Sequence, residues 1–314
     1  MQGNIADCWL IAPMMAIAKH RKLLEDIIPE NQYSLEFGIF PVRLLVDHIW
    51  TIVIVDGHFP ILPNETPYFA RYYGELWPNI IEKAVAKVIG GYHKLAGGIP
   101  ADAFRSLTGA SSISYMLGPD TDHGRLWDRI QFSLSSGFLI TLSTNQTDIE
   151  SYENFGLAHS HVYSLIETSI ADDRQLFLIG TTIWRRWNGK CSELVVYPED
   201  VTKNWEKSKK KMANQRLFWM EIDDFCKWFL LFTVCRYREG WDELRINGCH
   251  GEKSLYLHVS HRCQITIEIS LSDPKMWEYH DVGFIFVIDD IGKLALCFSV
   301  EFHRAQKVKI YKNY

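Results

Sequence analysis

The sequence lacks three features that would assign it to common protein classes. No stretch reaches the roughly 18 apolar residues of a membrane span, although 47% of the residues are hydrophobic. There is no excess of basic residues, since the formal net charge is −5, so nothing favours nucleic acid as a partner. The seven cysteines are an odd number without a repeating spacing. They therefore argue against a disulfide framework and favour a reducing, cytoplasmic location.

The sequence also lacks the composition of a disordered chain and the start of a secreted one. Aromatic residues make up 13% of the chain and 11 of them are Trp, which is typical of a well-packed globular protein. A length of 314 residues allows two or three domains. No basic segment precedes the first apolar stretch, so we do not expect a signal peptide.

A candidate reactive centre lies at the beginning of the sequence. The amide side chain of Gln2 precedes Cys8. After Cys8, apolar residues recur at helical spacing, and Asp7 is the predicted N-cap of this helix. A thiol in the first turn of a helix meets the positive end of the helix dipole, which favours the thiolate. The N–H of Cys8 and the Gln2 amide could together bind an oxyanion. Pro13 is expected to kink this helix.

Further elements are predicted by periodicity and by residues that end helices. Apolar positions between residues 75 and 92 predict an amphipathic helix that stops at Gly90 and Gly91. β-Branched and apolar runs predict strands at residues 38–47, 50–56, 138–143 and 175–180. Regularly spaced short strands at residues 255–259, 264–271, 282–288, 294–300 and 308–311 predict an antiparallel β-sandwich.

Four motifs resemble those of the calpains, which are papain-related intracellular cysteine proteases. QGNIADCWL is similar to the family signature QGxxGDCW, and GLAHSHVYSL is similar to GLxxxHAYxV. ELWPNIIEKAVAKVIGGY and LFWMEIDDF match two further family segments. The resemblance is nearest to the PalB-type atypical calpains, which lack a calmodulin-like domain.

The resemblance implies an α+β fold and three parts. Residues 1–98 would form the first subdomain of a papain-like protease core and residues 99–232 the second, with Gly97-Gly98 as the hinge between them. Residues 240–314 would form a truncated calpain-type β-sandwich domain. Met1 directly precedes the family glutamine, so we expect the sequence to be incomplete at this end.

The resemblance also implies the roles of three residues. Cys8 would be the nucleophile, His161 the general base and Gln2 the oxyanion donor, with the base on a strand. The family's catalytic asparagine falls on Gly180 or on Thr182, depending on which Trp is aligned. An asparagine introduced at the correct one of these positions is therefore expected to raise turnover. Ala6 replaces a family glycine and is expected to strain the turn before Cys8.

The calcium sites of the family are largely lost. Glu75 and Glu193 keep carboxylates at ligand positions, but Arg186 stands where another carboxylate is expected. We therefore expect no required cofactor and at most weak calcium binding.

These observations leave two functions open. The first is a cysteine endopeptidase that cuts exposed segments of proteins, weakened by the missing asparagine. The alternative is an inactive pseudoprotease that acts as a scaffold for partners or lipid. A transglutaminase-type acyl transferase with the same Cys–His pair has no independent support. The expected partners are protein substrates, with a weak lipid or protein contact through the sandwich domain.

Overall fold

The computed structural model describes most of the first 247 residues and the strands beyond them. The described residues are 2–29, 36–71, 75–146, 149–192, 216–247, 254–257, 265–271, 284–288, 294–298 and 306–312. The chain forms two compact units, Met1–Arg238 and Glu239–Tyr314. Within the described ranges, no helix has both the length and the apolar character that crossing a membrane requires.

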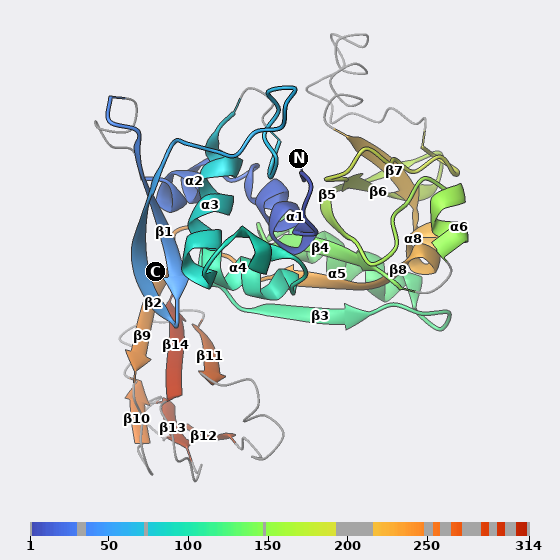
Figure 1. Ribbon diagram of the computed structural model, residues 1–314. Helices are drawn as coiled ribbons and strands as arrows, with labels where there is room; N and C mark the ends of the chain where they lie inside the picture. The colour runs from blue at the N-terminus through green and yellow to red at the C-terminus, as the bar shows by residue number, and fades with distance from the viewer. Residues whose placement is uncertain are drawn as a thin grey trace, which may run out of the picture. The chain divides into compact units, whose positions relative to one another are not determined.

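Helix α1, Cys8–Ile17, lies at the centre of the first unit (Figure 1). It contacts α3 and α4 on one side and strands β4 and β5 on the other. Almost all of its residues are buried, and it continues past Pro13 to Ile17. Ser164 on β5 donates a hydrogen bond of 2.7 Å to the carbonyl oxygen of Ala12. The nucleophile helix is therefore fixed to both halves of the unit.

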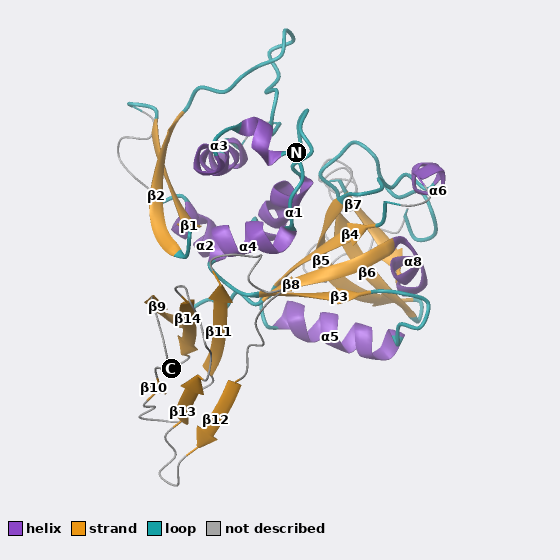
Figure 2. Cartoon of the chain, turned by 60° about the horizontal axis from the view of Figure 1, so that its bottom comes forward, coloured by secondary structure: helices purple, strands orange, loops and turns teal. Residues whose placement is uncertain are grey.

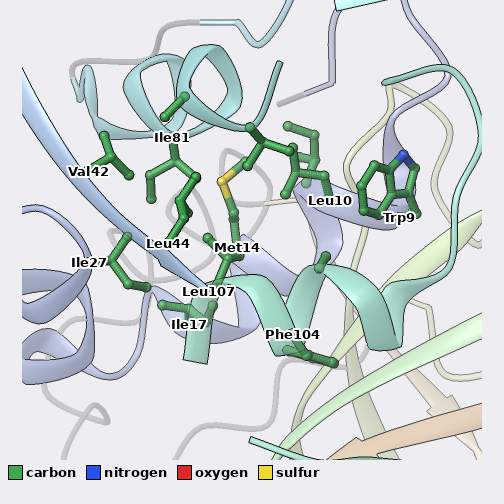
Figure 3. Packing of buried hydrophobic residues seen from close by; sticks show 14 of the residues in the cluster. Trp9, Leu10, Met14, Ile17, Ile27, Val42, Leu44, Ile81, Phe104 and Leu107 are labelled. Atoms are coloured by element: carbon green, nitrogen blue, oxygen red, sulfur yellow. The ribbon is translucent and has the colours of Figure 1, made fainter. Parts of the chain in front are cut away.

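One half of the unit combines helices with a β-hairpin. Strand β1, Ile39–Val46, pairs antiparallel with β2, Ile49–Asp56. Three helices and one short 3-10 helix accompany the hairpin: α2 (Arg21–Ile27), α3 (Trp77–Ile89), η1 (Tyr92–Leu95) and α4 (Pro100–Thr108). Their apolar side chains surround Met14 of α1 (Figure 3). Gly90 ends α3 in the left-handed conformation, with φ of 97°, as the sequence predicts.

The other half is a six-stranded antiparallel sheet. The order of its strands is β3-β8-β4-β5-β6-β7, and α5 lies against it (Figure 2). The strands are β3 (Ser112–Met116), β4 (Leu139–Thr144), β5 (Val162–Ala171), β6 (Arg174–Gly180), β7 (Leu217–Glu221) and β8 (Phe229–Cys235). Within the described residues, the helices of this half are α5 (His123–Ser135), α6 (Ile149–Asn154) and α8 (Ile222–Trp228). The sheet has its own hydrophobic cluster, separate from the one around Met14.

The second unit contains two antiparallel three-stranded sheets. Their strand orders are β10-β13-β12 and β11-β14-β9. The strands are β9 (Asp242–Asn247), β10 (Ser254–Leu257), β11 (Ile265–Leu271), β12 (Phe284–Ile288), β13 (Leu294–Phe298) and β14 (Gln306–Lys312). Five of them overlap the predicted runs, and β9 was not predicted. The face-to-face packing of a sandwich stays a prediction.

The mixed helices and antiparallel sheets confirm the predicted α+β class. Periodicity located the strands at 38–47, 50–56, 138–143 and 175–180 to within about two residues. It did not locate β3 or α5, which belong to a stretch with a mixed pattern, and it did not assign β8, an apolar run that carries no prediction. Asp122 caps α5 by accepting a hydrogen bond from the Arg125 N–H, a local signal that could have revealed this helix. The divisions predicted after residues 98 and 232 stay predictions.

Candidate active site

Cys8 is the first residue of α1, so its position in the first helical turn is as predicted. The prediction for the preceding residue is wrong in one respect, because the Asp7 side chain does not cap the helix. Its carboxyl group is fully buried instead, and only its backbone carbonyl accepts helix hydrogen bonds, from the N–H groups of Leu10 and Ile11. Ala6 does not have a positive φ, so the expected strain from the missing glycine is absent.

The Cys8 thiol is half-buried beside the residue that follows the candidate base. Burial raises its pKa above the usual value, and the negative charge of Asp7 adds to this effect. Hydrogen bonds from the backbone N–H groups of Val162 and Trp9 act in the opposite direction but do not outweigh burial. Burial therefore opposes the thiolate that the helix dipole favours, and the thiolate stays a prediction.

His161 lies directly before β5 rather than within a strand. Its backbone is fixed by Thr144, whose Oγ1 accepts from the His161 N–H at 2.9 Å and whose N–H donates to the His161 carbonyl at 3.0 Å. The ring packs edge-on against Tyr163, with 4.9 Å between the ring centres. Only 6% of the residue is exposed, and burial lowers its pKa to about 4. The imidazole is therefore neutral at pH 7 and available as a base.

The contact between α1 and β5 brings Cys8 near the segment that begins with His161, although the two are far apart in sequence. Ser160, the residue before His161, has a φ of 48°, a left-handed conformation that favours glycine. The close approach of α1 and β5 thus joins the two halves of the site.

Thr182, not Gly180, lies at the histidine. The Thr182 Oγ1 is 3.2 Å from His161 Nε2 and donates to Gln2 Oε1 at 3.4 Å. Gly180 is paired in the sheet between Ser164 and Leu217. A Cβ on Gly180 would lie 2.4 Å from the Met15 sulfur, so no side chain fits there without displacing α1.

Gln2 is held by its backbone and by its side chain. Its N–H donates to the Thr182 carbonyl at 3.0 Å, and its Nε2 donates to the Ile5 carbonyl at 2.7 Å. An amide nitrogen has two hydrogens, so one N–H of Gln2 remains for a ligand. A Cβ on Gly3 would lie 1.7 Å from the Phe69 carbonyl oxygen, which explains why glycine follows Gln2.

The weak calcium sites that the resemblance implies stay a prediction, and the structure describes the contacts of two of their residues. The Glu75 carboxylate accepts from the Trp77 indole N–H at 2.6 Å. Arg186 donates to the Ser192 carbonyl at 2.8 Å. It brings a positive charge to the position where the family is expected to have a carboxylate ligand. Among the residues that the structure describes, no three acidic, His or Cys side chains form a group that could hold a metal. Glu193 lies outside the described residues.

Sequence reasoning missed three contributors to the site: Thr144, Ser164 and Glu82. Thr144 holds the backbone of His161, Ser164 connects β5 to α1, and Glu82 faces Asp7 from α3. No sequence motif marks the first two. A glutamate on the apolar stripe of the helix at 75–92 was a signal for the third, because a buried carboxyl group needs a partner.

A cysteine at a helix start, a neutral histidine and an amide donor are the groups that a cysteine hydrolase uses. Comparison with known families agrees, because residues 1–236 match the model of the calpain family cysteine protease. The chain therefore belongs to the calpain family, as its motifs indicate.

Individual relatives carry the same family name. The chain is 29% identical over 290 residues to the calpain-type cysteine protease ADL1 of Oryza sativa subsp. japonica, covering 84% of this chain and 13% of the relative. It has the same identity and coverage with the calpain-type cysteine protease DEK1 of Zea mays. It is 30% identical over 249 residues to Calpain-8 of Mus musculus, covering 74% of this chain and 35% of the relative. The chain thus spans much less than half the length of these relatives.

Proposed function

We propose that this chain is the protease core of a calpain-type cysteine endopeptidase that cuts exposed segments of proteins. Cys8 attacks the scissile carbonyl carbon, and His161 takes the thiol proton through Nδ1, because Nε2 faces Thr182. The Cys8 N–H and the free Gln2 N–H stabilise the oxyanion. Collapse expels the amine, which leaves with the proton from His161. Water then hydrolyses the thioester by the reverse sequence of proton transfers.

The observation that carries this proposal is the chain of contacts around His161. Its ring faces Thr182, and the backbone N–H of the next residue, Val162, lies close enough to the Cys8 thiol to lower its pKa. A base must lie within hydrogen-bonding reach of the proton it removes.

Reaction with a peptidyl epoxide inhibitor tests the proposal. The wild-type chain should be labelled at Cys8, as located by mass spectrometry, and should cleave casein. Cys8→Ala should remove both activities, and His161→Ala should slow both. Cys226→Ala is a matched control, because this half-buried thiol also has a raised pKa but lies on α8. Absence of labelling and cleavage in the folded wild type would favour the pseudoprotease instead.

We further propose that the reaction needs no cofactor, that calcium binds weakly, and that the protein works in a reducing compartment. The Glu75 and Arg186 contacts support the second statement. The four cysteines within the described residues are all free thiols, which supports the third.

A further inference from the structure

Two buried carboxyl groups meet beneath the nucleophile. Asp7 directly precedes Cys8, and Glu82 lies in the middle of α3. Both residues are completely inaccessible to solvent. Buried carboxyl groups are rare unless they are paired with a cation or hydrogen-bonded, because the charged form is poorly solvated there.

Glu82 holds a backbone turn in place. Both of its carboxyl oxygens are 3.0 Å from the Ala70 N–H. The neighbouring Asn79 donates to the Ala70 carbonyl, so α3 binds both backbone groups of Ala70. This turn supports the segment before Cys8, since the Asn4 N–H donates to the Tyr68 carbonyl at 2.9 Å.

Asp7 has no such donor. Neither of its oxygens has a hydrogen-bond donor within the described part of the chain. The Glu82 carboxyl group is the neighbouring side chain that influences the pKa of Asp7 most, so the two carboxyl groups lie close together. Two ionised carboxylates are both acceptors and repel each other. The contact is favourable only when one of the two groups carries a proton.

We propose that Asp7 and Glu82 share one proton, and that this O–H···O bond ties the Gln2–Cys8 segment to α3 as a positioning pair for the nucleophile. The proton remains on Glu82 at neutral pH, and the ionised Asp7 accepts from it. Glu82 thereby satisfies two groups at once, accepting from Ala70 and donating to Asp7. The catalytic part of this inference rests on the proposed function, whereas the shared proton does not.

The charges around the pair define the pH range of this bond. Burial is the main cause that raises the pKa of Asp7 to about 6 and that of Glu82 to about 10. Each group also influences a neighbour, since Asp7 raises the pKa of Cys8 and Glu82 raises that of Tyr92.

The sign of the pH effect follows from these raised values. A carboxyl group with a raised pKa binds its proton more tightly in the folded state, so it favours folding at low pH and loses this contribution as pH rises. Because both pKa values are raised and burial raises that of Glu82 more, the pair keeps one proton around neutral pH and loses it only at alkaline pH. Both groups are then ionised and repel each other, and the segment before Cys8 should loosen.

Infrared difference spectroscopy of the whole chain tests the shared proton without using activity. The wild type minus Glu82→Gln spectrum at pH 8 should contain the carbonyl stretch of a protonated carboxylic acid. This band should disappear near pH 10. Its absence at pH 8 would overturn the proposal, whether or not the protein is a protease.

Two substitutions of Glu82 test the positioning role. Glutamine can still accept from Ala70 and donate to Asp7, whereas leucine can do neither. Glu82→Leu should slow labelling of Cys8 about 10-fold or more, since a small misplacement of a reacting group can cost about 10²-fold. Glu82→Gln should recover most of this rate and should lack the alkaline loss near pH 10.

The outcomes separate the two proposals. If Glu82→Gln is as slow as Glu82→Leu, the donor role of Glu82 is refuted. If the wild type is not labelled at all while the band is present, the protease function fails and the carboxyl pair stands. Should Glu82→Leu not fold, the band and the alkaline behaviour of Glu82→Gln still decide the question.

Discussion

Thr182→Val removes the hydroxyl group that faces His161, the candidate base, and changes little else. Valine keeps the β-branched shape of threonine, and the residue is fully buried. The substitution deletes two contacts, that of Oγ1 with His161 Nε2 at 3.2 Å and that with Gln2 Oε1 at 3.4 Å. The candidate base and the candidate oxyanion donor thus lose their common partner.

The size of the effect follows from these two contacts. A buried polar group that loses its partner costs about 1–3 kcal/mol, which corresponds to a rate factor of about 5 to 150 if it is felt in the transition state. The loss of the aspartate in a serine triad, about 10⁴-fold, is an upper bound. Because a hydroxyl group is neutral and mainly orients the ring, we expect kcat to fall by about 10 to 10².

The assay is the turnover of unfolded casein, with kcat and KM measured separately. Thr182→Ser retains the hydroxyl and should keep most of the wild-type kcat, while Thr182→Asn, which restores the family residue, should raise kcat. A wild-type kcat for Thr182→Val in a folded protein would refute the orienting role of Thr182.

Gly180→Asn distinguishes the two alignments of the family asparagine. The new Cβ would lie 2.4 Å from the Met15 sulfur, and overpacking of this kind costs about 1–3 kcal/mol. Thermal unfolding should therefore show a less stable protein with no gain in turnover. An increase in turnover would show that position 180, and not 182, serves the histidine.

Three further predictions concern the pH dependence, the packing of α1 and calcium. Because burial raises the pKa of Cys8, alkylation by iodoacetamide should accelerate with pH up to a midpoint above that of an ordinary thiol; a midpoint below neutrality would contradict this raised pKa. Ser164→Ala should lower the free energy of unfolding by about 1–3 kcal/mol, measured in urea, because the bond to the Ala12 carbonyl is lost; Ser169→Ala, also on β5, is the control. Calorimetry should detect no calcium binding tighter than about the millimolar range, and Glu75→Gln should leave the calcium affinity unchanged. Binding in the micromolar range would refute the prediction of weak calcium binding.

Local sequence determined the elements and the candidate roles. The run after Cys8 predicts the helix that carries it, and Gly90 predicts the end of α3, because helix periodicity and glycine's left-handed freedom are properties of short segments. The motifs at Gln2, Cys8 and His161 identified the family, which the match over residues 1–236 confirms. Their catalytic roles remain predictions, which the proposed labelling experiment tests.

Only the tertiary structure decided what surrounds these residues. The sequence left Gly180 and Thr182 as equal candidates, and the pairing of β6 with β5 and β7 turns one toward Met15 and places the other at His161. The dipole of α1 predicted a thiolate, yet burial between α1 and β5 raises the pKa of Cys8. Asp7 was predicted as a helix cap and instead meets Glu82. Each outcome depends on groups far apart in the chain, because desolvation and steric fit arise only when separate elements pack together.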